Sequence, residues 1–157
     1  PMRLRQPDLS EEIASVLLEF DLEPSRIEFE ITETMMANAT QECSHQIHAL
    51  SDLGFKLSLD DFGTGFSNLA YLRSLPVDTL KIDRSFVSLT EGDMTIANAI
   101  IGLGASFGKT IVAEGIETRE QEQALIRLGC DEGQGFLYSK AVPASRIEEM
   151  FGTVFVH

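Results

Sequence analysis

Five segments of the chain alternate apolar and polar residues with a period of two, which is typical of β-strands. In the first segment, Ile27, Phe29 and Ile31 alternate with glutamates. Longer stretches with a different spacing separate the five segments. The predicted strands are residues 26–32 (RIEFEIT), 56–61 (KLSLDD), 79–83 (TLKID), 110–115 (TIVAEG) and 133–139 (GQGFLYS).

Between the strands, and toward both ends of the chain, apolar residues recur at helical spacing. In the first predicted helix, the apolar stripe consists of Ile13, Leu17 and Phe20. Glycines mark several helix ends, because glycine readily adopts the left-handed conformation of a C-terminal cap. The predicted helices begin at Ser10, run through 43–53 to Gly54, lie around Leu69 and Leu72 before Pro76, span 96–107 before Gly108, run from Thr118 to Gly129, and begin at Ser145.

Capping residues mark the start of three of these helices. Ser10 is a favourable N-cap for the first helix. Thr118 and Gln121 have the spacing of a capping box, in which each side chain bonds to the backbone N–H of the other residue. Ser145 and Glu148 have the same spacing, and we interpret them as the cap of the last helix.

Strands that alternate with helices indicate right-handed βαβ units and a parallel sheet. Five such units follow one another without a Pro/Gly/Ser-rich linker, so we expect one α/β domain. The pattern fits part of a (β/α)8 barrel or an open doubly wound sheet. A complete barrel takes about 250 residues. A barrel of 157 residues would therefore be incomplete, with about five βα units.

A polar residue stands at or near the carboxyl end of each predicted strand. In four of the five strands it lies opposite the apolar face, which in a barrel is the inner face at the catalytic end. Parallel strands are usually apolar on both faces, so the presence of polar residues at these positions needs an explanation. Carboxylate oxygens are ligands of hard divalent cations, and a lysine can supply a positive charge beside them. The residues are Glu30, Asp60, Lys81, Glu114 and Gln134, with Asp61 directly after Asp60.

Other interpretations exist for single residues. Any one of the strand-end groups could be a solvated loop residue or a helix cap, but five in one register argue against that. His45 and His48 could bind a metal, although solvated helix positions explain them better. The GTG of residues 63–65 is too short for a nucleotide-binding fingerprint. Cys43 and Cys130 have no metal-ligand spacing and make no disulfide framework.

Composition narrows the class of protein. The hydrophobic fraction of 43% and the charged fraction of 24% are those of an ordinary globular domain. A net charge of -13 argues against general nucleic-acid binding, which requires a basic surface. No apolar run approaches the roughly 20 residues of a membrane helix. We expect a cytoplasmic domain, although its parent protein could be membrane-anchored.

The segments that carry the strand-end residues resemble, in order and spacing, the successive motifs of the EAL family of cyclic di-GMP phosphodiesterases. The resemblance extends across essentially the whole chain. We therefore interpret residues 1–157 as the C-terminal portion of a single EAL domain. The motifs are EITE at 30–33, DDFGTGFSNL at 60–69, LKID at 80–83, AEGIE at 113–117 and QGFLYSK at 134–140.

The resemblance implies a (β/α)8 TIM-like barrel that binds two Mg²⁺ or Mn²⁺ ions and hydrolyses cyclic di-GMP to linear pGpG in bacterial signalling. Lys81 would hold or activate the attacking water, and Glu114 would act as a ligand or as the general base. Gln134 would bind a water or the substrate near the metals. The implied metal ligands are Glu30, Asp60, Asp61 and Glu114.

The resemblance also implies a loop braced by Glu33, with Glu117 supporting the site from behind. The loop continues to residue 68, and in the family it leads to a homodimer interface, so a homodimer is expected. Fusion to sensory or cyclase domains is expected as well. The loop residues singled out are Phe62, Gly63, Thr64 and Gly65.

The family's Glu-Ala-Leu motif and an Asn ligand would precede Pro1, so the first strands of the barrel would be missing. We therefore expect this fragment alone to be inactive. The alternative function is a catalytically inactive EAL domain that acts as a cyclic di-GMP receptor or a protein-interaction module. Inactive domains of this kind typically lose metal ligands, and the chain retains those that fall within it, which favours the enzyme.

Overall fold

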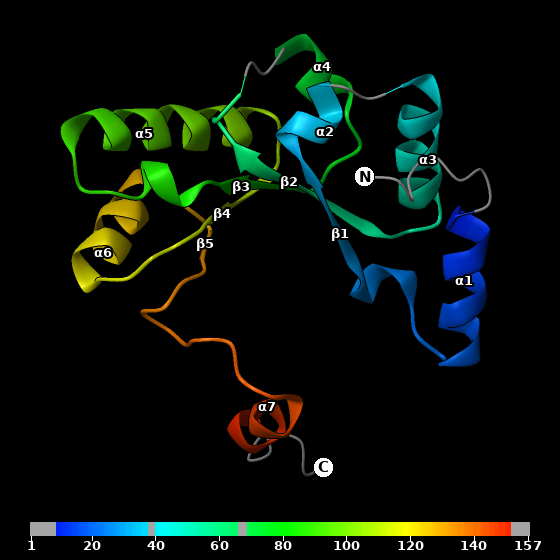
Figure 1. Cartoon of the computed structure of the whole chain (residues 1–157). Helices are drawn as coiled ribbons and strands as arrows, with labels where there is room; N and C mark the ends of the chain where they lie inside the picture. The colour runs from blue at the N-terminus through cyan, green and yellow to red at the C-terminus, as the bar shows by residue number, and fades with distance from the viewer. Residues whose placement is uncertain (1–8, 38–39, 66–68, 152–157) are drawn as a thin grey trace.

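The structure of the chain is a computed structural model, and it describes residues 9–37, 40–65 and 69–151. Its centre is a sheet of five parallel strands, in which each strand pairs with the next one along the sequence. Figure 1 shows helices on several sides of this sheet, whereas the last helix (Ala144–Phe151) lies apart from it. The strands are β1 (Glu28–Thr32), β2 (Lys56–Phe62), β3 (Thr79–Ile82), β4 (Thr110–Ala113) and β5 (Glu132–Gly133).

The strand order decides between the two folds that the sequence left open. A doubly wound sheet reverses its strand order at a switch point. Here the order is β1-β2-β3-β4-β5 and all neighbouring pairs are parallel, so each crossover steps in the same direction. This is the winding of a (β/α)8 barrel. The sheet is therefore an arc of such a barrel, with β1 and β5 as its outer strands.

The helices begin and end largely where their caps predict. Thr118 and Gln121 form the predicted capping box, with both of its hydrogen bonds present. Gly129 follows with a left-handed backbone, and Gly54 has a φ of +89° after the third helix. The helices are α1 (Leu9–Glu19), α2 (Glu33–Ala37), α3 (Gln41–Asp52), α4 (Leu69–Ser74), α5 (Glu91–Ser106), α6 (Arg119–Leu128) and α7 (Ala144–Phe151), with one-turn 3-10 helices η2 (Pro24–Arg26) and η3 (Arg84–Phe86).

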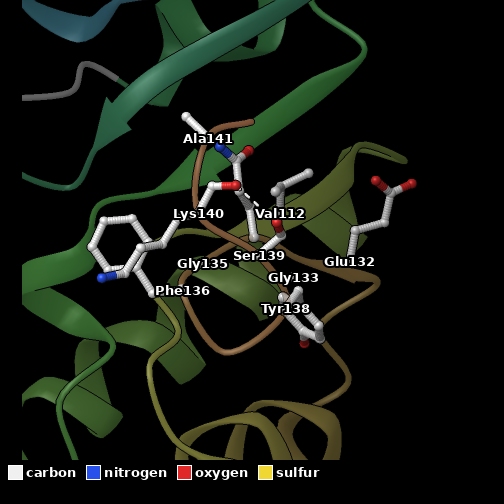
Figure 2. A pocket seen from close by; sticks show the side chains of 10 residues that line it. Val112, Glu132, Gly133, Gly135, Phe136, Tyr138, Ser139, Lys140 and Ala141 are labelled. Carbon is white, nitrogen blue, oxygen red and sulfur yellow. Dashed lines mark hydrogen bonds between the residues drawn. The ribbon is translucent and has the colours of Figure 1, made fainter. Parts of the chain in front are cut away.

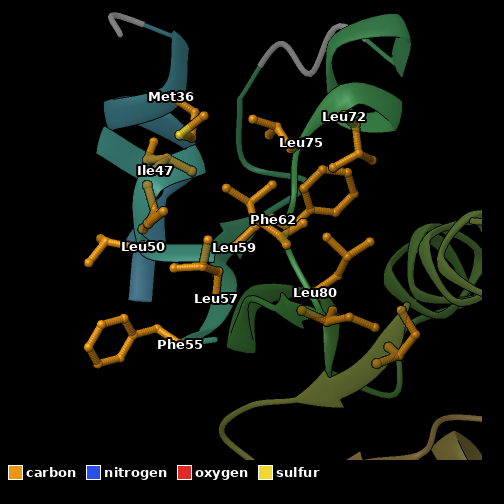
Figure 3. Close-up of a cluster of buried hydrophobic side chains, with 14 of the residues drawn as sticks. Met36, Ile47, Leu50, Phe55, Leu57, Leu59, Phe62, Leu72, Leu75 and Leu80 are labelled. Carbon is orange, nitrogen blue, oxygen red and sulfur yellow. The ribbon is translucent and has the colours of Figure 1, made fainter. Parts of the chain in front are cut away.

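The main hydrophobic core lies between the sheet and the helices that cover its outer face (Figure 3). The alternating apolar residues of β2 and β3 are almost completely buried there, as the period of two predicts. The opposite face of these strands carries polar residues. Core residues contributed by the sheet and by α3 include Leu57, Leu59, Leu80, Ile82, Ile47 and Leu50.

The first helix differs from its prediction at both ends. Leu9 is already helical, so the helix does not begin with Ser10 as its cap. Ile13 and Leu17 pack on the core as predicted, but Phe20 is 64% exposed and lies beyond the helix end at Glu19. The chain turns directly after Phe20, where Asp21 has a φ of +52°. The helix therefore ends before Phe20, and this residue is not part of the core.

The prediction of a strand over residues 133–139 is wrong. The strand β5 ends at Gly133, and the following residues form turns in which Gly135 O accepts hydrogen bonds from Tyr138 N at 3.1 Å and Ser139 N at 3.4 Å. Gly135 lies directly against the backbone of Ile116, so closely that no Cβ would fit. This close approach folds the segment back instead of letting it extend along the sheet.

Two further helix predictions need correction, and one short helix was not predicted. Ser145 lies inside α7 and does not cap it, because the carbonyl of Pro143 already accepts a hydrogen bond from Arg146 N at 2.9 Å. The helix α5 starts at Glu91, well before the predicted 96, because Thr90 caps it. The short helix α2 has no counterpart among the predicted elements. None of the described helices is both long and apolar enough to cross a membrane.

Candidate active site

Four of the predicted strand-end residues come together because neighbouring parallel strands end at one edge of the sheet. In the β1–β2 ladder, Glu30 pairs with Ser58. Asp60 is two residues beyond Ser58 and therefore lies on the same face as Glu30. Lys81 occupies the corresponding face of β3. Glu114 follows β4 directly, and its N–H donates to Ile82 O at 3.1 Å, which continues the ladder. Four adjacent strands thus contribute one charged side chain each.

Lys81 is the centre of this cluster. Its Nζ lies 2.5 Å from Glu30 Oε1, 2.5 Å from Glu114 Oε1 and 3.8 Å from Asp60 Oδ1. The lysine side chain is only 8% exposed, whereas that of Glu30 is 56% exposed. Burial alone would lower the pKa of Lys81, but its hydrogen bonds to Glu114 and Glu30 raise it above its usual range. The ammonium group therefore stays charged near neutral pH and binds carboxylates contributed by strands on both sides of β3.

A backbone irregularity places the neighbouring carboxylates Asp60 and Asp61 at the same edge. The β2–β3 register shifts between Leu59 and Phe62, and Asp61 has a φ of +56°, which is unusual for a residue with a side chain. Asp61 N donates to Asp60 Oδ1 at 2.9 Å. Partial burial raises the pKa of Asp61, and the negative charges of Asp60 and Asp83 raise it further. Strained backbone of this kind is concentrated at functional sites.

Glu33 contacts the loop after β2, which the family resemblance implies that it braces. Its Oε2 atom accepts hydrogen bonds from Gly63 N at 3.0 Å and Gly65 N at 3.1 Å, and the residue is 6% exposed. Gly63 has a φ of +98°, and a Cβ there would lie 2.8 Å from Ile100 Cδ1. Thr64 Oγ1 donates to Asp61 O at 2.8 Å, which ties the loop back to the carboxylates.

Other residues of the predicted site have different positions. Phe62 is buried in the hydrophobic core, so it anchors the loop and does not face the carboxylates. Residues 66–68 of the predicted loop lie outside the described residues. Glu117 is exposed, and its backbone N–H donates to Gln121 Oε1 at 2.8 Å as part of the α6 cap. Its predicted supporting role stays a prediction.

Gln134 follows β5 and continues the sheet through its backbone. Its N–H donates to Ala113 O at 2.8 Å, and its carbonyl accepts from Ile116 N at 3.0 Å. The exposed side chain lines a hollow of about 630 Å³ formed mainly by residues 132–141 (Figure 2). In the same hollow, the Lys140 ammonium lies 5.6 Å from the centre of the Phe136 ring. Gln134 is thus accessible to a water or a ligand.

The donor chemistry of the cluster suits a hard divalent cation. Three carboxylates, Glu30, Asp60 and Glu114, lie within 4 Å of one ammonium group, and Asp61 follows Asp60 directly, so negative charge is in excess. Among the described residues, no three Asp, Glu, His or Cys side chains already converge as a metal cage. The Glu30 and Glu114 oxygens are instead directed at Lys81.

Two further findings concern His45, His48 and Asp83, which are not among the predicted site residues. The imidazoles of His45 and His48 are exposed on α3, which agrees with their interpretation as solvated positions. Asp83 is not among the predicted site residues, although it ends the LKID motif. Its carboxylate accepts from Ser85 N at 3.0 Å, and its charge acts on Asp61. The sequence signal for Asp83 was its place directly after β3.

Comparison with known proteins agrees with this geometry. Residues 1–141 match the family model described as EAL domain. The chain is 40% identical over 142 residues to the bifunctional diguanylate cyclase/cyclic di-GMP phosphodiesterase MucR of Pseudomonas aeruginosa, which covers 88% of this chain and 21% of MucR. The chain thus spans about a fifth of the length of the curated relatives that it matches.

Solved structures give the same result. A cyclic di-GMP complex of the MucR phosphodiesterase has a TM-score of 0.86 at 40% identity, over 93% of this chain and 60% of that chain. A manganese and cyclic di-GMP complex of BlrP1 from Klebsiella pneumoniae has a TM-score of 0.81 at 31% identity, over 88% of this chain and 36% of that chain. EAL domains are TIM barrels, which confirms the predicted incomplete barrel. Its sequence, its singly wound sheet and these likenesses show that the chain belongs to the EAL domain family.

Proposed function

We propose that this chain forms the greater part of an EAL domain that hydrolyses cyclic di-GMP to linear pGpG. The observation that carries the proposal is the convergence of Glu30, Asp60 and Glu114 on Lys81 at the carboxyl edge of the sheet. Barrel enzymes have their active sites at this edge. The relationship to MucR, whose phosphodiesterase has been solved in complex with cyclic di-GMP, supports the choice of substrate.

Divalent ions, Mg²⁺ or Mn²⁺, would be held by the four carboxylates. The manganese complex of BlrP1 supports this part of the proposal. Such ions, when bound, neutralise phosphate oxygens and favour deprotonation of a water nucleophile. Two ions are expected from the family resemblance. The residues that would hold them are Glu30, Asp60, Asp61 and Glu114.

The remaining groups would orient and deprotonate the attacking water. Glu114 Oε1 and Lys81 Nζ lie 2.5 Å apart, so one water molecule can contact both groups. Lys81 would donate a hydrogen bond to that water or to the phosphate, and Glu114 would accept the proton. Gln134 would hold a water or the substrate from the adjacent strand. Glu33 would keep the loop after β2 in place.

We also propose that these five βα units require the rest of an EAL domain for activity. The chain covers 60% of the solved MucR phosphodiesterase, which supports this part of the proposal. An open sheet edge leaves strand N–H and C=O groups unpaired, and a Mg²⁺ site needs nearly octahedral oxygen coordination. The homodimer, the fused domains and the cytoplasmic location stay predictions.

The test is product formation from cyclic di-GMP with Mn²⁺, using the full-length protein that carries this chain. We expect linear pGpG from the unaltered protein and at least about a 100-fold loss in Asp60→Asn and Glu114→Gln. Glu149→Gln is the matched control, because that exposed carboxylate pairs with Arg146 on the same helix, α7. Binding of cyclic di-GMP without any turnover by the unaltered protein would refute the enzyme and support a receptor.

A further inference from the structure

The oxygens that would bind a cation are already in contact with one. Glu30 Oε1 and Glu114 Oε1 are each 2.5 Å from the same atom, Lys81 Nζ. Asp60 Oδ1 is 3.8 Å from that atom, so three carboxylates lie around one ammonium group. The lysine reaches Glu30 across β2, since β1 and β3 are not neighbours in the sheet. A protein cation thus occupies the centre of the carboxylate cluster.

We propose that Lys81 competes with divalent cations for Glu30 and Glu114, so that it limits the metal affinity of the site. Binding of a metal ion is then an exchange, in which the ammonium group releases one or both glutamates as the ion takes them. This inference rests on the proposed function, because it assumes that the carboxylates are metal ligands. It adds a second role for Lys81, which is to set how tightly the metal is held.

The competition has two physical components. Two short, charge-assisted hydrogen bonds must be given up, and bonds of this type are roughly twice as strong as neutral ones. In addition, the displaced ammonium remains close to the ion, because Lys81 is 8% exposed and has little room to move away. Like charges a few ångströms apart repel strongly when water is largely excluded. Both components weaken metal binding.

One effect acts in the opposite direction. Without the ammonium group, the carboxylates repel one another and their side chains can separate, which would make them less ready to bind an ion. The backbone limits this effect, because the parallel ladders fix Glu30, Ser58 and Lys81 relative to one another. Only side-chain rotamers remain to be ordered. The loss of the competing charge therefore dominates, and its removal should tighten metal binding.

The experiment measures Mn²⁺ binding by calorimetry, without substrate, in the full-length protein that carries this chain. Lys81→Met and Lys81→Gln both remove the charge while keeping most of the side-chain volume. We expect each to bind Mn²⁺ at least about 10-fold more tightly than the unaltered protein. Lys81→Arg keeps the charge and should show no such gain. The matched control is Lys56→Met, which removes an ion pair of 2.9 Å with Asp78 at the amino ends of the strands, opposite the carboxylate cluster. This variant should leave the Mn²⁺ affinity unchanged.

A second readout protects the test against misfolded variants. The rise in melting temperature caused by Mn²⁺ should be larger in Lys81→Met than in the unaltered protein, since a ligand that binds the folded state more tightly stabilises it more. Unchanged or weaker Mn²⁺ binding by both neutral, folded variants would overturn the inference while leaving the proposed function intact. An unaltered protein that binds no Mn²⁺ would instead refute the proposed metal site, and the inference with it.

Discussion

Replacement of Glu33 tests how the loop after β2 is held beside the carboxylates. Its buried carboxylate accepts hydrogen bonds from Gly63 N at 3.0 Å and Gly65 N at 3.1 Å. Glu33→Ala removes the acceptor of both amides, whereas Glu33→Gln keeps an oxygen of similar position without the charge. The loop should therefore open more often in both variants, and most often in Glu33→Ala.

The magnitude follows from the two bonds. A hydrogen bond to a charged group contributes about 1.5–3 kcal/mol net. Water can replace part of this, because Gly63 is only half-buried and Gly65 is exposed. We therefore expect Glu33→Ala to destabilise the closed loop by about 2–4 kcal/mol, which corresponds to about 30- to 1,000-fold in its opening equilibrium. Glu33→Gln should cost about half as much, since neutral hydrogen bonds are about half as strong.

The assay is amide hydrogen exchange, followed at Gly63 and Gly65 in the two variants and in the unaltered protein. The amide of Leu57 donates to Asp78 Oδ2 at 3.0 Å at the amino ends of the strands, and it should keep its protection. Glu28→Ala, which removes an exposed carboxylate of β1, is the control variant. Equal protection of the two glycine amides in Glu33→Ala and in the unaltered protein would refute the brace.

Three other perturbations test the candidate site and the stability of the fold independently. In the full-length protein, Lys81→Met should lower turnover of cyclic di-GMP by about 100-fold or more, and near-normal turnover would contradict its role in catalysis. Gly104→Ala should lower the free energy of unfolding by about 1–3 kcal/mol in urea, because its Cβ would overlap a side chain of β4. Gly102→Ala on the same helix meets no atom within 4 Å and should be neutral or stabilise by about 1 kcal/mol, so equal effects would be inconsistent with this packing. Burial raises the pKa of Asp78, but hydrogen bonds, chiefly from Lys56, bring it below its ordinary value. Because this pKa is lower in the folded state, the ion pair stabilises the fold above about pH 4, and this stability is lost as the pH falls. Asp78→Asn should therefore lose less stability on acidification than the unaltered protein. An unchanged dependence of the free energy of unfolding on acid pH would count against the ion pair.

The pattern of apolar residues predicts the fold where a strand buries one face in a single hydrophobic core. The strands β2 and β3 are predicted almost to the residue, because Leu57, Leu59 and Leu80 must all reach the same core. The segment after Gly133 has no such constraint. Its alternation is present in the sequence, but the contact of Gly135 with the backbone of Ile116 turns the chain away. A contact between residues so far apart leaves no local periodicity.

For the candidate site, alternation predicts the face of each residue but not its partners. Lys81 lies on the inner face of β3, and period two is sufficient to place it there. Its contact with Glu30 depends on the order of the strands and on the reach of two long side chains across β2. Neither property is local in the sequence. The family motifs indicate which residues belong together, and the parallel register explains why they meet.

The neighbouring aspartates illustrate how a strand can violate its own alternation. In a regular strand, Asp60 and Asp61 would point to opposite faces, and one of them would enter the hydrophobic core. The register shift before Phe62 and the left-handed backbone of Asp61 avoid this, at a cost of roughly 1–2 kcal/mol for a residue with a side chain. Glycine would adopt the same backbone without that cost. The chain has a carboxylate there instead, beside a second carboxylate that raises its pKa. Backbone strain combined with charge repulsion does not favour the stability of the fold, and the proposed role of Asp61 in cation binding would account for both.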